Sequence, residues 1–345
     1  MIRRPPRSTQ SRSSAASDVY KRQALLMGRD AKDPECRLDG MTKPLIIYTS
    51  KEAHYSNDKN ASFAGIGRKN MRYIATDSKG RMLANALAAQ VMEDIADGGI
   101  PTYVNATAGT TVLGAFDPID AIADITEKYG MWLHVDGAYC GSVIFSEDYK
   151  HLVTGVERSN SFSYNAHKML GTPLTCSILL VNDKKHLHDS FSNDADYLYQ
   201  TDGDDFNLGK TSFQCGRRND ALKFWTLWKS VGTNGLKDIV DQQFNLADIA
   251  LAYIRSNPEY TLYSFDDSIS VCFNYKDIEP MALCTALYEH QITVVGFGSF
   301  EADTFVRLVT INANNEAVDI LNFFQVLEGF VAKTPHLEKV AALPV

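Results

Sequence analysis

The 345-residue sequence lacks long apolar runs, and no stretch approaches the roughly eighteen consecutive apolar residues that a membrane-spanning helix needs. It also lacks an excess of basic residues: the formal net charge is −8, which argues against nucleic acid as a partner. The six cysteines form no CxxC pair and no zinc-like spacing, so we expect buried free thiols in a reducing, cytoplasmic compartment, and no metal site. The 45% of hydrophobic residues suffices for a soluble globular protein of two domains, or one large domain with an appendage.

The N-terminal segment differs in composition from the rest of the chain. Residues 1–23 are rich in arginine and serine and contain a single acidic residue, Asp18. That composition fits a mitochondrial transit peptide, but the apolar helical face of such a peptide is missing. The segment resembles translated sequencing-adapter sequence, and we therefore predict that residues 1–23 are non-native.

Short apolar runs alternate with helical stretches in the next part of the chain. The predicted helix over 118–129 shows the pattern well, with Asp117 as its N-cap, Pro118 in the first turn and Gly130 at its end. Strands separated by helices favour a mainly parallel sheet with helices on both faces. The predicted strands are 45–48, 72–75, 102–105, 131–135, 161–164 and 176–181.

A turn cluster at 232–235 precedes a long predicted helix over 236–256. We place a domain boundary there, between a large domain over 24–235 and a small C-terminal α+β domain over 236–345. The predicted elements of the small domain after that helix are strand 269–275, helix 281–289, strands 292–295 and 306–311, and helix 318–333.

Asp136 and Lys168 are the most informative residues of the chain. Each follows a predicted buried strand, at the kind of sheet edge where open α/β folds bind ligands. Alone, such an aspartate is usually a turn or cap residue, and such a lysine is usually solvated. Together they meet the needs of pyridoxal 5'-phosphate (PLP), which requires a lysine amine to hold it as a Schiff base and a carboxylate to keep its pyridine nitrogen protonated. The pair therefore predicts a PLP site.

Five motifs occur in a fixed order along the chain. They are Thr49-Ser50 with His54-Tyr55-Ser56, Asn105 to Thr111, His134 to Tyr139, Asn165 to Lys168, and Gln214 to Arg217. In this order they resemble the group II PLP-dependent amino acid decarboxylases, above all the glutamate, cysteine sulfinate and aspartate decarboxylase branch. Because members of that family begin well before the strand at 45–48, the resemblance implies an N-terminally truncated chain.

The resemblance implies a fold-type-I, PLP-transferase-like α/β fold and a homodimer. The implied reaction is decarboxylation of an acidic L-amino acid, with glutamate first, to the amine and carbon dioxide. Lys168 would hold the cofactor, Asp136 would pair with its ring nitrogen, and His54 would stack on one ring face with Ala138 against the other. The further implied contacts are Thr110 near the cofactor's phenolic oxygen or the substrate carboxylate, Asn165 and His167 at the phosphate, and Gly216 at the phosphate of the other subunit.

Arg307 is a charged residue inside a predicted apolar strand. A buried guanidinium needs an anionic partner, and its planar fork fits a carboxylate. The partner is either an acid of the large domain, in a structural salt bridge, or, as the resemblance implies, the α-carboxylate of the substrate.

The segment between Leu198 and Gln214 departs from the family, in which a loop tyrosine usually protonates the product carbon. Here the loop is shorter, no tyrosine follows Tyr199, and Phe206 cannot donate a proton. Either another group or water delivers the proton, or the reaction turns toward oxidative deamination, as in the related aldehyde synthases; retention of His54 favours decarboxylation. The sequence is also compatible with an aromatic amino acid decarboxylase and with an inactive dimerising fragment.

Overall fold

The larger of two β-sheets is mainly parallel, as predicted. The computed structural model describes residues 8–192, 208–214, 218–334 and 337, with side chains from Val19 onward. The sheet has six strands in the order β2-β1-β3-β4-β5-β6; only β6 runs antiparallel to its neighbour. The strands are β1 (Leu45–Ser50), β2 (Met71–Ile74), β3 (Ile100–Thr107), β4 (Trp132–Gly137), β5 (Ser161–Asn165) and β6 (Ser177–Val181).

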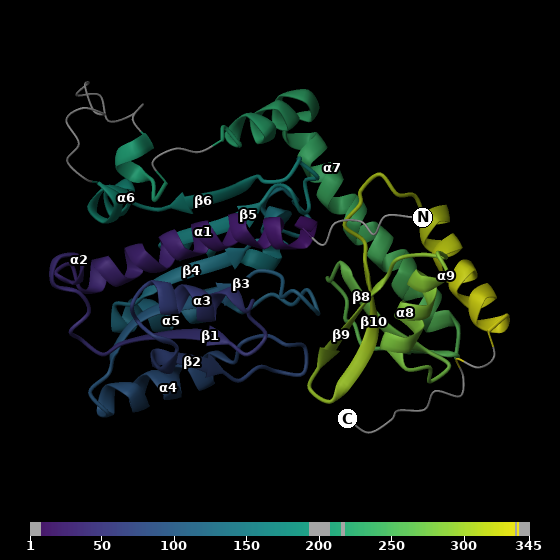
Figure 1. The fold of residues 1–345 in the computed structure, drawn as a ribbon, viewed down its shortest axis with the longest axis horizontal. Helices are drawn as coiled ribbons and strands as arrows, with labels where there is room; N and C mark the ends of the chain where they lie inside the picture. The colour runs from purple at the N-terminus through teal and green to yellow at the C-terminus, as the bar shows by residue number, and fades with distance from the viewer. Residues whose placement is uncertain (1–7, 193–207, 215–217, 335–336, 338–345) are drawn as a thin grey trace.

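Helices cover both faces of this sheet because neighbouring strand residues point to opposite sides. Trp132 of β4 packs with Ala24 and Met27 of α1, whereas the next residue, Leu133, packs with Ile122 of α5. Helix α1 contacts β3, β4, β5 and β6, and Figure 1 shows it running along the strands on one face of the sheet. The helices around the sheet are α1 (Ser8–Lys32), α2 (Cys36–Asp39), α3 (Ser56–Phe63), α4 (Ala84–Ala96), α5 (Ile119–Tyr129) and α6 (Lys184–Phe191).

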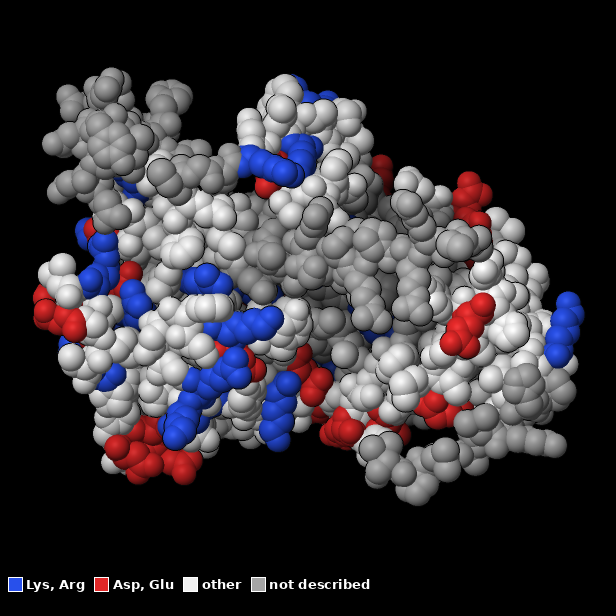
Figure 2. Space-filling model, in the orientation of Figure 1, with Lys and Arg blue, Asp and Glu red and all other residues white. Residues whose placement is uncertain are grey.

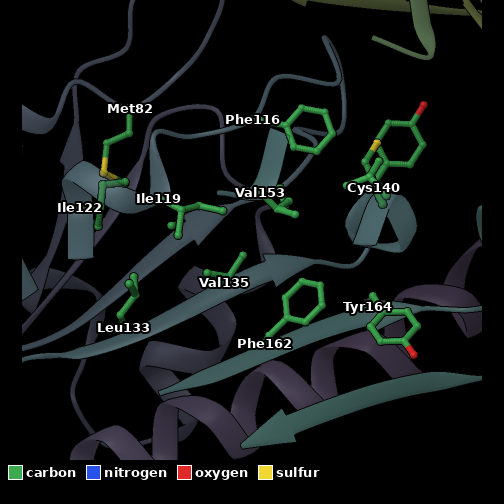
Figure 3. Packing of buried hydrophobic residues seen from close by; sticks show 14 of the residues in the cluster. Met82, Phe116, Ile119, Ile122, Leu133, Val135, Cys140, Val153, Phe162 and Tyr164 are labelled. Carbon is green, nitrogen blue, oxygen red and sulfur yellow. The ribbon is translucent and has the colours of Figure 1, made fainter. Parts of the chain in front are cut away.

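The main hydrophobic core lies on the α5 face of the sheet. In Figure 3, Val135 and Phe162 project from neighbouring strands toward Val153, and Ile119 and Ile122 of α5 complete the cluster beside them. The core holds β4 and β5 side by side. It therefore also fixes the positions of the ends of these two strands, where Asp136 lies and where the segment that leads to Lys168 begins.

The C-terminal part forms a four-stranded antiparallel sheet in the order β7-β8-β10-β9. Helix α7 joins the two parts, because Leu236 and Phe244 lie in the core of the large sheet while Leu246 and Ile254 lie in that of the small sheet. Within α7, Gly232 has a non-helical backbone with φ 70°. The elements are α7 (Ala221–Ser256), β7 (Tyr260–Leu262), β8 (Ser270–Tyr275), α8 (Pro280–Glu289), β9 (Gly296–Phe300), β10 (Asp303–Val309) and α9 (Ala317–Ala332).

The predicted strand at 292–295 is wrong. The strand in this region is β9, which begins at Gly296 and pairs with β10 across a tight turn at Glu301, where φ is 54°. Glycine counts against a strand in a sequence pattern because it has no side chain to pack. Here Gly298 serves a close approach, since a Cβ on it would lie 2.9 Å from the Cγ1 of Val112.

Asp117 does not cap the helix that follows it, contrary to the prediction. Its carboxylate instead accepts hydrogen bonds from the backbone N–H groups of Met82, at 2.6 Å, and Thr107, at 2.7 Å. Helix α5 begins at Ile119 and ends as predicted at Gly130, which adopts the left-handed conformation with φ 57°. The buried carboxylate therefore ties β3 to the segment before α4.

The described part of the chain has buried thiols and a surface of mixed charge. Within the described ranges, no helix is long and apolar enough to cross a membrane. The five described cysteines are buried and free, as predicted; Cys215 lies outside the described residues. On the face shown in Figure 2, described basic and acidic side chains are interspersed, with the basic ones most frequent over the large-sheet part.

Replacing Asp117 with alanine leaves the N–H groups of Met82 and Thr107 without their acceptor. A buried, unpaired donor costs about 1–3 kcal/mol, so we expect the free energy of unfolding to fall by at least about 2 kcal/mol in urea denaturation. Asp124→Ala, on the exposed side of α5, is the control and should change it by no more than about 0.5 kcal/mol. Equal losses in the two variants would contradict the structural role of Asp117.

Candidate active site

The candidate site lies where β3, β4 and β5 end. The strand register places Thr107, Asp136 and Ser163 side by side at the carboxyl ends of these parallel strands. Asp136 has the same strand parity as Trp132, which packs against α1. Its carboxylate therefore lies on the α1 side of the sheet, at the edge where the sequence predicted a ligand.

Asp136 is buried and ionised. Its side chain is 3% exposed, and its Oδ1 accepts a hydrogen bond of 3.1 Å from the backbone N–H of Ala138. Its Oδ2 lies 2.6 Å from the Nζ of Lys21. Burial is the largest influence on the pKa of this carboxyl and raises it, but the Lys21 ammonium and weaker contributions, including the Ala138 N–H, together bring the net pKa below its usual value. The site thus holds a fixed negative charge at neutral pH.

Lys168 lies in the turn that follows β5, where its backbone N–H donates to the carbonyl of Asn165 at 3.0 Å. Its side chain is partly buried, with Nζ 5.8 Å from the centre of the Tyr139 ring. Burial, assisted by the positive charge of Lys21, lowers the pKa of Lys168 to about 8, although Asp136 acts in the opposite direction. An amine with this pKa is deprotonated often enough at neutral pH to attack an aldehyde.

His54 is neutral in this environment. Burial first, and then the charge of Lys21, lowers the pKa of its imidazole to about 4. The charges of Asp136 and Lys168 also act on its pKa, which indicates that the three residues share one site. The Nδ1 atom of His54 accepts a hydrogen bond of 3.2 Å from the backbone N–H of Ser56, so the proton of the neutral ring is on Nε2.

His134 is a further site residue that the sequence reasoning did not single out. Its Nδ1 lies 2.9 Å from the Oγ of Ser161, and its Nε2 lies 3.3 Å from the Oγ of Ser163. Burial lowers its pKa to about 4, so it adds no charge beside Asp136. The signal for it was present in the alternation along β4, which places His134 and Asp136 on one face.

Four further residues that were predicted to contact the cofactor or the substrate are described, and they differ in their hydrogen bonds. The Nδ2 of Asn165 is buried and has no hydrogen-bond partner among the described residues, whereas the Nδ1 of His167 is 3.0 Å from the backbone nitrogen of Cys176, which donates to it. The Oγ1 of Thr110 accepts from the backbone N–H of Ala115 at 3.0 Å, within its own turn. Ala138 orients Asp136 through its N–H. Gly216 and Phe206 lie outside the described residues.

Arg307 reaches the site from β10 of the small sheet. Its Nε donates to the carbonyl of Val112 at 3.0 Å, and its Nη2 is 3.4 Å from the Oγ of Ser270. Its guanidinium carbon lies 5.7 Å from the centre of the Tyr139 ring, the same ring that faces Lys168. Among the residues that the structure describes, Arg307 has no carboxylate within ion-pair distance, so the structural salt bridge considered for it is not seen there.

Lys21 was also missed as a site residue, because it belongs to the segment predicted to be non-native. Nothing in the local sequence distinguishes it from the other basic residues of 1–23. Its side chain is nevertheless only 4% exposed, and it contacts the carboxylate predicted to serve the cofactor. Only the packing of α1 on the sheet brings the two residues together.

The model of the pyridoxal-dependent decarboxylase conserved domain matches residues 7–276. The chain belongs to this family. Pyridoxal phosphate is the cofactor of the family, which confirms the predicted family and cofactor. The site residues assigned above stay predictions, since the match covers the domain as a whole.

Two relatives of the chain belong to the acidic amino acid branch of the family. The chain is 40% identical over 263 residues to the cysteine sulfinic acid decarboxylase of Mus musculus, covering 74% of this chain and 53% of that protein. It is 42% identical over 258 residues to acidic amino acid decarboxylase GADL1 of Mus musculus, covering 73% of this chain and 47% of that protein. The chain thus spans about half the length of the curated relatives it matches.

Solved structures confirm the predicted fold class. The crystal structure of mouse CSAD superposes with a TM-score of 0.83 at 34% identity, covering 90% of this chain and 70% of that one. The crystal structure of Oryza sativa TDC with PLP and tryptamine gives a TM-score of 0.85 at 25% identity, with coverages of 92% and 69%.

The lowered pKa of Lys168 can be measured by competitive acetylation. We expect its labelling by acetic anhydride, followed by peptide mass spectrometry, to rise with a midpoint of about pH 8. Lys185 is the matched reference, because its hydrogen bond to Asp189 raises its pKa above the ordinary lysine value. Lys168 should therefore become reactive at a clearly lower pH than Lys185, and coincident profiles would refute the proposed environment of Lys168.

Proposed function

We propose that the protein is a PLP-dependent decarboxylase that removes the α-carboxyl group of an acidic L-amino acid, such as cysteine sulfinate, aspartate or glutamate. The observation that carries the proposal is that one edge of the large sheet holds both an anion and an amine with a lowered pKa. Asp136 is buried yet ionised, and Lys168 is a partly buried amine with a pKa of about 8. The acidic substrate is supported by the names of the similar proteins, which are a cysteine sulfinic acid decarboxylase and an acidic amino acid decarboxylase.

The residues present fit the cofactor. The Lys168 amine would bind its aldehyde group, and the Asp136 carboxylate would face its ring nitrogen. The Nδ2 of Asn165 is a buried donor without a partner in the described part of the chain, and a donor of that kind suits an anionic phosphate. When bound, PLP supplies the electron sink for the pair of electrons released from the Cα–carboxylate bond.

The surrounding side chains would support this chemistry through their charge states. Asp136 would hold the proton on the ring nitrogen, because an ionised carboxylate in a poorly solvated site favours a neighbouring cation. His54 and His134 both have pKa values of about 4 and would remain neutral, so neither would repel a cationic ring. Lys168 would be the nucleophile before substrate arrives.

Arg307 would bind the substrate's α-carboxylate. Its Nε and Nη2 are engaged by Val112 and Ser270, which fix the guanidinium plane, while its remaining N–H groups would donate to an anion. A carboxylate held there would set the orientation of the bond that breaks.

A homodimer is part of the proposal. Large apolar side chains are exposed at the start of α7, where Leu222 is 54%, Trp225 59% and Trp228 39% exposed. Clustered apolar exposure of this kind favours contact with another protein surface, and a second copy of the chain is the partner that the family resemblance implies.

The function is tested by measuring carbon dioxide release from cysteine sulfinate, aspartate, glutamate and tyrosine in the presence of PLP. We expect kcat/KM for at least one acidic substrate to exceed that for tyrosine by at least about a hundredfold, since a site built for a charged group rejects a substrate without it. Lys168→Ala is the inactive control. Preferential turnover of tyrosine, or formation of an aldehyde with ammonia instead of an amine, would overturn the assignment in favour of an aromatic amino acid decarboxylase or an aldehyde synthase.

The role of Asp136 is tested by Asp136→Asn, which keeps the shape of the side chain and removes its charge. Turnover should fall by more than about tenfold, equivalent to about 1.4 kcal/mol of barrier, because the ring nitrogen would lose the anion that keeps it protonated. The exposed carboxylate of Asp189 provides the matched control, Asp189→Asn, which should leave turnover unchanged. A smaller loss in Asp136→Asn would show that the carboxylate does not serve the cofactor.

A further inference from the structure

Tyr139 ends the motif that begins at His134, and the proposed function gives it no role. Its side chain is 8% exposed, so it is buried just after the end of β4. The Nζ of Lys168 lies 5.8 Å from the centre of its ring, and the Cζ of Arg307 lies 5.7 Å from the same point. The ring therefore lies close to both the amine and the guanidinium that the proposed function assigns to the cofactor and the substrate.

The hydroxyl of Tyr139 connects to the guanidinium through a second residue. It lies 2.9 Å from the Oγ of Ser270, which is fully buried on β8. The same Oγ accepts a hydrogen bond of 3.4 Å from the Nη2 of Arg307 on β10. Burial is the largest influence on the pKa of Tyr139 and raises it, so the hydroxyl keeps its proton at neutral pH. Tyr139, Ser270 and Arg307 thus form one hydrogen-bonded chain.

The register of β8 and β10 explains why Ser270 reaches Arg307. Cys272 pairs with Arg307, and Ser270 points to the same side of β8 as Cys272, which makes Ser270 a diagonal neighbour of the arginine. The Nε of Arg307 donates to the carbonyl of Val112 at 3.0 Å, in the segment after β3. The guanidinium is therefore held at two of its edges, by Val112 and by Ser270, and Tyr139 holds Ser270.

We propose that Tyr139 is a positioning residue for the substrate: through Ser270 and through the face of its ring, it fixes the orientation in which Arg307 meets the α-carboxylate. This inference rests on the proposed function, because it takes Arg307 to be the group that binds that carboxylate. A guanidinium that is free to turn loses the planar, bidentate fit on which carboxylate binding depends. Tyr139 therefore acts on ligands that carry an α-carboxylate and not on ligands without one.

The first test compares the amino acid with its product amine in the PLP-loaded protein, using the acidic amino acid that is turned over fastest. Tyr139→Phe removes the hydroxyl and keeps the ring, and we expect kcat/KM to fall at least about fivefold, as for the loss of one hydrogen bond. The inhibition constant of the product amine should change by less than about twofold, because the amine has no α-carboxylate for Arg307 to bind.

Tyr260→Phe is the matched control for this test. Tyr260 is also 8% exposed, and its hydroxyl donates a hydrogen bond of 2.9 Å to the Oε1 of Glu328 in the small-sheet part. The variant loses a buried tyrosine hydroxyl of the same kind without touching Arg307, so kcat/KM and the inhibition constant of the amine should both stay unchanged.

Ser270→Ala tests whether the effect of the hydroxyl passes through Ser270. Alone, this substitution should lower kcat/KM by a factor similar to that of Tyr139→Phe. The double variant should lose little more than Ser270→Ala alone, because residues that act in one chain are not additive. Losses that multiply in the double variant would overturn the inference.

A further measurement needs neither substrate nor cofactor. Phenylglyoxal modifies guanidinium groups, and its rate of reaction with Arg307 can be followed by peptide mass spectrometry relative to Arg158, whose guanidinium is held by carboxylates of α5. We expect Tyr139→Leu to raise this relative rate at least about threefold, because Arg307 loses the ring beside it and Ser270 loses its hydroxyl partner.

The outcomes separate this inference from the proposed function. If carbon dioxide is released from an acidic amino acid but Tyr139→Phe leaves kcat/KM unchanged, or weakens amine and amino acid equally, the inference is wrong and the proposed function stands. Unchanged labelling of Arg307 in Tyr139→Leu would have the same meaning. If no acidic amino acid is decarboxylated, both are overturned.

Discussion

The arrangement of the site depends on one constraint, which is that a carboxylate buried at the end of the central strand β4 must have a cation beside it. Removing an isolated charge from water is far costlier than any single packing interaction, so an ionised Asp136 is stable only in a pair. The same shielding that makes the pair necessary keeps His54 and His134 neutral and lowers the pKa of Lys168 to about 8. The site therefore holds one anion, Asp136, and one amine with a lowered pKa, Lys168.

The small sheet contributes to this site as well as the large one. Tyr139 follows β4 directly, and its hydroxyl lies 2.9 Å from the Oγ of Ser270 on β8. Ser270 also contacts Arg307, and both Arg307 and Lys168 lie close to the face of the Tyr139 ring. The Tyr139 ring therefore lies near both the predicted cofactor lysine and the predicted substrate arginine. The relative position of the two sheets thus sets the relative position of these two residues.

Much of this arrangement could be predicted from the sequence because it is encoded locally. Short runs with aromatic residues before Asp136 and Lys168 indicate buried strands, and alternation with helices indicates a parallel sheet whose strand ends share an edge. Contacts between segments that are far apart along the chain leave no such pattern in the sequence. Lys21 reaches Asp136, and Ser270 reaches Tyr139, only through the packing of whole elements. Likewise, Asp117 has the sequence signature of a helix cap, but two backbone N–H groups from elsewhere in the fold take its carboxylate.

Helix α7 belongs to both parts of the molecule, since its side chains pack in the hydrophobic cores of both sheets. Neither core can open without exposing apolar side chains of α7, so the two sheets are not independent units of stability. Amide protons in the stretch from Leu236 to Ile254 should therefore be released only when the whole molecule opens, and they would be among the last to exchange with deuterium. Substitutions in either core would then change the exchange rates in the other.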